Sequence, residues 1–170
     1  IEPSDVLVAS TGIIGEAFPT AKIIQGIKES VPYLTSRSVA GSLAANAILT
    51  TDTFPKEDYV NFKVDGKEIN MGGIAKGSGM IHPNMGTMLA FIICDIAITS
   101  ELLDKALREC VDATFNMINV DGDTSTNDMA AIMCNGAAGN RLIEEEDDDY
   151  ELFKNSLKET CLQLAKLIVS

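Results

Sequence analysis

Hydrophobic residues along the chain follow helical spacing in four segments. They recur three and four positions apart over residues 100–115 and 150–169, which predicts two amphipathic helices with one buried face each. A shorter helix is predicted over 19–29, where Pro19 suits a first turn. Residues 35–49 are rich in Ala, Ser and Gly and predict a helix that packs closely against a neighbour.

Other segments have the composition and alternation of strands. Residues 59–64 and 67–71 flank Asp65-Gly66, and Asp-Gly between alternating segments is a strong hairpin signal. Short apolar runs predict three further strands, over residues 5–10, 87–96 and 128–134. The pattern therefore predicts a mixed α and β fold, with long helices laid over buried strands.

Composition narrows the class of protein. The chain has 170 residues, fits one domain or part of one, and is 46% hydrophobic. No apolar run reaches the roughly 18 residues of a membrane span, and residues 1–4 have no signal-peptide pattern and no initiator Met, so we expect a processed or excised piece. The formal charge of −12 disfavours binding to nucleic acid or to anionic membranes.

Cysteine and histidine usage restricts the chemistry. His82 is the only histidine, so the chain alone cannot build a histidine metal cluster or a Ser-His-Asp triad. The acidic run 144–149 predicts a solvated loop, with a metal site as the alternative. The cysteines are widely spaced, without a C-x-x-C pair, and predict reduced core thiols of a cytoplasmic protein: Cys94, Cys110, Cys134 and Cys161.

Thr87 is the candidate nucleophile. A glycine-rich, turn-forming stretch places it at the head of an apolar segment, directly after Gly86, whose carbonyl a neighbour can approach closely. This is the arrangement of a self-cleaving N-terminal nucleophile, because cleavage frees an α-amine with a reference pKa of about 7.7–8.0 to act as the base. The alternative is that Thr87 simply begins a strand, where β-branched residues are common.

Two further candidates lie in turns. Thr11 and Gly12 follow the first predicted strand, where a hydroxyl and a backbone N–H could face a developing oxyanion; the alternative is an ordinary turn. Lys76 is flanked by glycines, so its ammonium could enter a cleft, although a loop lysine is usually just solvated.

The polar loop 120–128 invites comparison with a calcium site, but its spacing does not fit. Thr126 stands where that loop needs Gly, and Ile132 stands where it needs a bidentate Glu. A loop closed by Asx and Ser/Thr turns is favoured, with Thr124 or Asn127 as residues that could border a pocket.

Taken together, five segments resemble the ornithine acetyltransferase family, the glutamate N-acetyltransferases of arginine biosynthesis. Their order and spacing cover nearly the whole chain, and the Lys76–Leu89 block is the most specific: residues 8–15, 50–53, 76–89, 120–128 and 135–140. The resemblance implies an α+β fold of the αββα sandwich type, of which this chain is a fragment.

The resemblance also implies an activity. The precursor would cleave itself between Gly86 and Thr87 and then move an acetyl group from N-acetylornithine to glutamate through acetyl-Thr87. Thr11 and Gly12 would form the oxyanion hole, and the substrate contacts would be Thr50, Lys76 and Thr87. No metal or organic cofactor is implied, and acetyl-coenzyme A is a possible co-substrate.

The family pattern further implies how the chain is divided. Residues 1–86 would belong to the C-terminal part of the α-chain region and residues 87–170 to the N-terminal part of the β-chain region, together forming one structural domain. The two chains would form an α2β2 heterotetramer in the cytoplasm. Gly86 replaces the usual Ala, and the family's substrate-binding Glu is expected beyond Ser170.

Two other readings of the residues stay open. One is an amidase or aminopeptidase of the same self-cleaving type, in which water accepts the acyl group. The other is a folded fragment without turnover.

Overall fold

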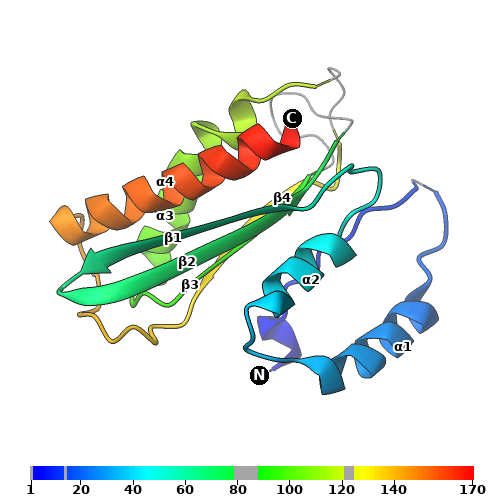
Figure 1. Ribbon diagram of the computed structural model, residues 1–170, viewed down its shortest axis with the longest axis horizontal. Helices are drawn as coiled ribbons and strands as arrows, with labels where there is room; N and C mark the ends of the chain where they lie inside the picture. The colour runs from blue at the N-terminus through cyan, green and yellow to red at the C-terminus, as the bar shows by residue number, and fades with distance from the viewer. Residues whose placement is uncertain (1, 14, 79–87, 121–124) are drawn as a thin grey trace.

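A four-stranded sheet forms the centre of the computed structural model, which describes residues 2–13, 15–78, 88–120 and 125–170 (Figure 1). The strands lie in chain order: β1 (Lys56–Val64), β2 (Lys67–Lys76), β3 (Leu89–Cys94) and β4 (Met129–Cys134). β2 runs antiparallel to β1 and β3, whereas β3 and β4 are parallel. The sheet is therefore mixed, and the predicted hairpin and the strands predicted over 87–96 and 128–134 are confirmed over the residues described.

The register of the sheet determines which strand ends meet. Lys76, the last residue of β2, pairs with Leu89, the first residue of β3. Leu89 in turn pairs with Met129, the first residue of β4. The carboxyl end of β2 thus lies beside the amino ends of β3 and β4, so these three strand termini meet at the same end of the sheet.

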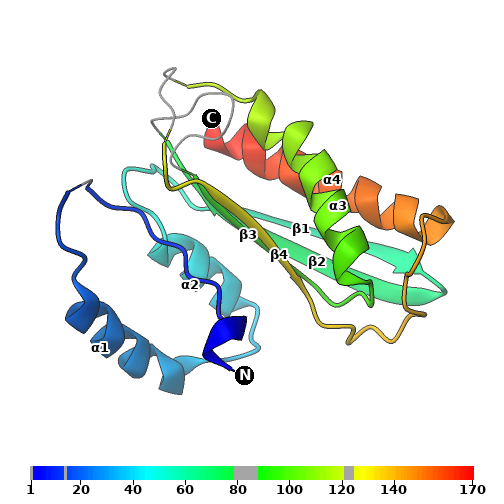
Figure 2. The same cartoon turned by 180° about the vertical axis from the view of Figure 1, so that it is seen from behind.

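Two long helices cover one face of the sheet: α3 (Ser100–Asp112) and α4 (Asp148–Ile168) (Figures 1 and 2). α4 approaches β2 closely at Gly73, where a Cβ atom would lie 2.8 Å from Leu164 Cδ1. The core between sheet and helices contains the largest buried side chains, among them Met71, Met88, Ile92, Phe115, Tyr150, Phe153 and Leu157. Both amphipathic helices predicted from the sequence are confirmed.

The acidic run contributes to a helix, so the prediction that all of it is a solvated loop was wrong. Asp147 is the N-cap of α4 and accepts a hydrogen bond from the Tyr150 N–H at 3.0 Å. Asp148 and Asp149 follow in the first turn, where the helix dipole favours negative charge. All four cysteines are free, and Cys94, Cys110 and Cys161 are buried, as predicted.

The N-terminal part lies on the other side of the sheet (Figure 2). It contains α1 (Thr20–Ser30), α2 (Val39–Ala47) and the 3-10 turns Pro3–Asp5 and Val31–Tyr33; α2 contacts β1 and β2. The strand predicted over 5–10 was wrong, because residues 6–10 form no strand with any described part of the chain and Val6, Leu7 and Val8 are exposed. A segment with this apolar pattern forms a strand only when another strand is available to hydrogen-bond with its backbone.

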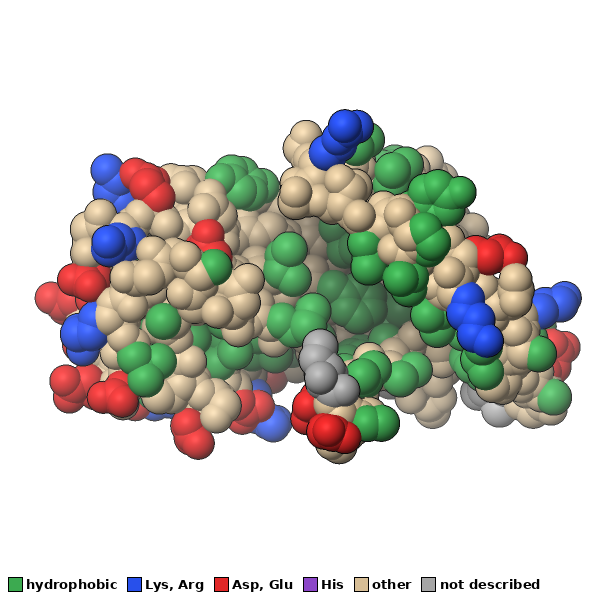
Figure 3. Space-filling view, turned by 90° about the horizontal axis from the view of Figure 1, so that it is seen from below, with side chains coloured by type: hydrophobic (Ala, Val, Ile, Leu, Met, Phe, Trp, Pro, Cys, Tyr) green, Lys and Arg blue, Asp and Glu red, His purple; other side chains and the backbone are tan. Residues whose placement is uncertain are grey.

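The second face of the sheet is partly open. Tyr59, Ile93 and Met133 are 65%, 61% and 56% exposed. Seen from below, hydrophobic side chains gather around a hollow in the middle of the molecule (Figure 3). The described residues thus supply one sheet of an α+β fold, with α3 and α4 on one face and the N-terminal helices on the other side; the second sheet of the expected sandwich does not occur among them.

Candidate functional site

Lys76 is the centre of a polar cluster at the carboxyl end of β2. Its side chain is only 3% exposed, and its Nζ donates to Thr11 Oγ1 at 3.3 Å and to Thr50 Oγ1 at 3.4 Å. These three residues are separated by 65 and 26 positions in the chain. The structure therefore brings together three residues that the sequence analysis named.

Burial lowers the pKa of Lys76 from its ordinary value, while the negative charges of Asp52 and Asp128 oppose that shift. Both hydrogen bonds that the ammonium makes to described residues are to neutral hydroxyls. A buried cation whose direct partners are neutral attracts an anionic group that can enter its site. The cluster is thus suited to binding a small carboxylate.

Asp52 links the Thr50 segment to the end of β2. Its side chain is fully buried, and Oδ1 accepts from the Gly77 N–H and from Lys56 Nζ, each at 2.7 Å. Oδ2 accepts from the Thr50 N–H at 3.3 Å. Although burial favours the neutral acid, the hydrogen bonds from Lys56 and Gly77 hold the pKa of Asp52 below its ordinary value. The carboxylate therefore fixes the backbone on both sides of the Lys76–Thr50 contact.

Asp128 is the second carboxylate near this strand end. Its Oδ1 accepts from the Met88 N–H at 2.7 Å, and the next residue, Met129, donates its N–H to the Met88 carbonyl at 3.1 Å. Burial raises the pKa of Asp128, and the attraction to Lys76 opposes the rise. The sequence analysis assigned no role to Asp52 or Asp128; their place in two of the matched segments was the only signal.

Thr11 and Gly12 line a cavity of about 170 Å³. Asn127 borders the same cavity, which confirms the prediction that it could line a pocket. The N-terminal segment and the segment before β4 therefore meet at the site, although more than 100 residues separate them in the sequence. The full lining is Ser10, Thr11, Gly12, Ile13, Phe18, Thr126 and Asn127.

Several predicted residues lie outside the described part of the chain. These are Gly86 and Thr87, together with His82 and Thr124. The nucleophile and the cleavage site therefore stay predictions. Among the residues that are described, no group of three or more His, Cys, Asp or Glu side chains is arranged to hold a metal ion.

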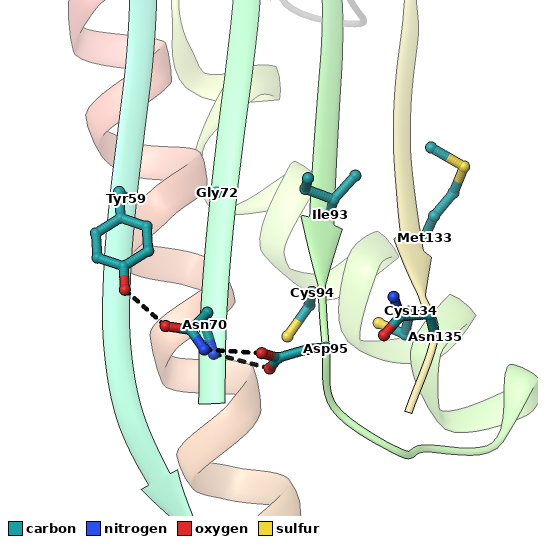
Figure 4. A pocket seen from close by; sticks show the side chains of 9 residues that line it. All are labelled: Tyr59, Asn70, Gly72, Ile93, Cys94, Asp95, Met133, Cys134 and Asn135. Atoms are coloured by element: carbon teal, nitrogen blue, oxygen red, sulfur yellow. Dashed lines mark hydrogen bonds between the residues drawn. The ribbon is translucent and has the colours of Figure 1, made fainter. Parts of the chain in front are cut away.

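A larger cavity of about 420 Å³ lies towards the other end of the sheet, on its open face (Figure 4). Its polar side chains bind one another: Tyr59 donates to Asn70 Oδ1 at 2.7 Å, and Asn70 donates to Asp95 Oδ2 at 2.8 Å. None of the site residues predicted from the sequence lines it. The Lys76 cluster is thus the better candidate for the functional site.

The fold and the cluster define an α+β protein with a buried lysine, two threonine hydroxyls and two carboxylates around one strand end. The chain belongs to the ArgJ family, whose model matches residues 1–170.

Curated relatives agree with this assignment. The chain is 50% identical over 168 residues to "Arginine biosynthesis bifunctional protein ArgJ 1" of Clostridium acetobutylicum, covering 99% of this chain and 41% of that protein. It is 50% identical over 169 residues to the Bacillus subtilis "Arginine biosynthesis bifunctional protein ArgJ", covering 99% of this chain and 40% of that protein. The chain thus spans about two fifths of the length of the curated relatives it matches.

A solved structure is also similar. It is the crystal structure of the arginine biosynthesis bifunctional protein argJ from Bacillus halodurans, with 43% identity and a TM-score of 0.42 over 44% of this chain and 35% of that one. Within the described residues, no helix is both long enough and apolar enough to cross a membrane.

Proposed function

We propose that the protein carrying this chain transfers an acetyl group from N-acetylornithine to glutamate, through an acetyl ester on Thr87. The observation that carries the proposal is the buried Lys76, which lies between the hydroxyls of Thr11 and Thr50. Membership of the ArgJ family and the naming of its relatives for arginine biosynthesis support it. Both substrates carry an α-carboxylate, the kind of group that a buried ammonium attracts.

Activation of the precursor would begin at the bond between Gly86 and Thr87. The Thr87 hydroxyl attacks the Gly86 carbonyl carbon, the peptide C–N bond breaks, and the acyl group moves from nitrogen to oxygen. Water then hydrolyses the ester, which leaves a carboxylate on Gly86 and a free hydroxyl and free α-amine on Thr87. The amine can serve as the base for that hydroxyl because both belong to one residue.

Acetyl transfer would follow in two halves. The amine takes the hydroxyl proton while Oγ of Thr87 attacks the acetyl carbonyl of N-acetylornithine; the amide C–N bond breaks, and ornithine leaves with that proton. The amine of glutamate then attacks the acetyl ester, which yields N-acetylglutamate and restores the hydroxyl. In each half the Thr11 hydroxyl and the Gly12 N–H stabilise the oxyanion, and one such donor is typically worth about 3–4 kcal/mol.

The remaining features of the proposal concern the whole protein. The scheme requires no metal or organic cofactor, and acetyl-coenzyme A would enter only as an alternative acetyl donor. The mature enzyme would consist of two chains of one precursor, assembled as an α2β2 heterotetramer in the cytoplasm.

The test is acetyl transfer by the complete protein, with labelled N-acetylornithine as donor and glutamate as acceptor. We expect transfer by the unaltered protein and by a Thr35→Ala control in the exposed loop before α2, and none by Thr87→Ala, which should also stay a single chain by denaturing mass spectrometry. Full transfer by Thr87→Ala would overturn the proposal. Release of acetate without transfer to glutamate would instead identify the amidase alternative.

A further inference from the structure

Two cysteines lie opposite each other on neighbouring strands. Cys94 and Cys134 are register partners in the parallel pair of β3 and β4, and each is the last residue of its strand. Asn135 donates its N–H to the Cys94 carbonyl oxygen at 3.2 Å, so the two backbones are hydrogen-bonded at this pair. Register partners project their side chains to the same face of a sheet, and both cysteines contribute to the core that the helices cover. The ladder therefore holds two thiols side by side.

The spacing of the pair suits a disulfide bond. Neighbouring strands lie about 4.7–4.9 Å apart, which is within the roughly 4.4–6.8 Å that separates the Cα atoms of a disulfide. Both thiols are free, and the Cys134 thiol donates a hydrogen bond to the Cys94 sulfur. The two sulfur atoms are thus already neighbours, and no other part of the fold has to move for them to bond.

A small oxidant can reach this pair. Cys94 and Cys134 both border the cavity of about 420 Å³ at this end of the sheet (Figure 4). Cys94 is only 5% exposed, but Cys134 is partly exposed. The other two cysteines, Cys110 on α3 and Cys161 on α4, are buried and do not border this cavity. Access therefore distinguishes one pair of cysteines from the other.

Electrostatics distinguishes the same pair. The hydrogen bond from Cys134 lowers the pKa of Cys94, with the Ile96 N–H acting in the same direction and burial opposing both. That hydrogen bond, together with burial, raises the pKa of Cys134. Burial raises the pKa of Cys110 to about 11 and that of Cys161 to about 12. Because the thiolate is the reactive form, Cys94 is the thiol of the four that is best prepared to react.

We propose that Cys94 and Cys134 form an oxidation site, at which a hydroperoxide oxidises Cys94 and Cys134 then closes a disulfide bond between β3 and β4. With hydrogen peroxide, the Cys94 thiolate attacks one oxygen, the O–O bond breaks, and the released hydroxide takes up the proton that Cys94 lost. The Cys134 sulfur attacks the sulfenic sulfur of Cys94, the S–O bond breaks, and the second hydroxide leaves with the Cys134 proton. Two thiols are oxidised, and one peroxide is reduced to two waters.

The site is separate from the Lys76 cluster. Cys94 pairs with Met71 at the end of β3, whereas Lys76 pairs with Leu89 at its start. No residue of the pair takes part in the proposed acetyl transfer, so the inference goes beyond the proposed function and does not depend on it. The bond is reversible, because a dithiol reductant restores both thiols by exchange.

The test is peptide mass spectrometry of the complete protein after exposure to hydrogen peroxide. Remaining thiols are alkylated in denaturant without reduction. Cys110 and Cys134 share one tryptic peptide, so a second protease that cleaves before aspartate is needed to separate them at Asp112. We expect a peptide of Cys94 linked to a peptide of Cys134, lighter by two hydrogen atoms than their sum, which dithiothreitol separates. The thiol of Cys94 should be lost about tenfold faster than that of Cys110.

A variant identifies which cysteine reacts first. In Cys134→Ser the serine hydroxyl can still donate to the Cys94 sulfur, but it cannot close a disulfide. Cys94 should therefore stop at the sulfenic acid and be captured by dimedone, whereas the unaltered protein should give no such adduct. The matched control is Cys110→Ala, which removes a thiol outside the pair and should form the disulfide at the same rate as the unaltered protein.

The outcomes decide the inference in either direction. The Cys94–Cys134 link supports it, and the dimedone adduct at Cys94 in Cys134→Ser supports the order of the two steps. Peroxide treatment that leaves Cys94 and Cys134 reduced, or that links Cys110 to Cys161 instead, overturns it. The measurement on the unaltered protein decides the matter alone if Cys134→Ser does not fold.

Discussion

The carboxylate of Asp52 accepts the backbone N–H of Gly77 at 2.7 Å, and in this way the loop after α2 is attached to the residue that follows Lys76. The same oxygen accepts from the buried ammonium of Lys56. Neither Asp52 nor Lys56 was proposed to contact substrate. Their contribution is to keep Thr50 and Lys76 at hydrogen-bond distance.

Removing one charge of the Asp52–Lys56 pair should therefore be costly. In Asp52→Asn the Lys56 ammonium stays buried without its counter-ion, and breaking a buried pair in this way typically destabilises by about 3–5 kcal/mol. Urea denaturation should show this loss. The control is Glu68→Gln in the Lys63–Glu68 pair, whose side chains are 70% and 55% exposed, where we expect about 1 kcal/mol or less.

The stability contributed by Asp52 should depend on pH in a defined direction. Its pKa is lower in the folded state than in the unfolded state, so its contribution is fully present above the unfolded value of about 3.9 and is lost as the pH falls through the folded value. Free energies of unfolding measured from pH 7 downwards should therefore converge for the unaltered protein and Asp52→Asn below about pH 4. A difference that stays constant down to pH 2 would contradict the assignment.

Lys76→Ala tests the carboxylate-binding role of the lysine. Losing an ammonium that hydrogen-bonds a charged group costs about 1.5–3 kcal/mol, so KM for glutamate should rise about 10–100-fold. Cleavage before Thr87 should persist, as judged by the presence of two chains in mass spectrometry. Lys67→Ala, at the exposed hairpin end of β2, is the control, and loss of cleavage alone in Lys76→Ala would indicate a structural role instead.

The close approach of α4 to the sheet predicts a difference between two neighbouring glycines. In Gly73→Ala the new Cβ would lie 2.8 Å from Leu164 Cδ1 and 3.2 Å from Thr160 Cγ2, so we expect a destabilisation of about 1–3 kcal/mol. In Gly72→Ala the nearest described atom is the Asp58 carbonyl oxygen at 3.9 Å, an ordinary contact. Thermal denaturation should therefore show a clearly lower Tm for Gly73→Ala than for Gly72→Ala.

Local sequence patterns predicted the elements whose cause is local. The hairpin follows from Asp65-Gly66, where both residues adopt positive φ, and the helices follow from periodic apolar positions. The strand predicted over 5–10 was wrong because pairing depends on a distant edge. The division at Gly86 and Thr87 into two chain regions of one domain stays a prediction.

The site was predictable only in part, for a similar reason. Thr11 and Lys76 were candidates from their places in the sequence, Thr50 was named through the family resemblance, and the structure places the three together. The roles of Asp52 and Asp128 could not be foreseen, because each depends on a backbone N–H that only the folded chain brings near: Gly77, 25 residues away, and Met88, 40 residues away.

The place of β3 inside the sheet, between β2 and β4, determines how the two chains would stay together after the predicted cleavage. If the chain is cleaved just before β3, the new amino end is followed by a strand that is hydrogen-bonded to β2 on one side and to β4 on the other. Loss of covalent continuity would then not release either piece, and the two products would remain one body until the whole sheet came apart.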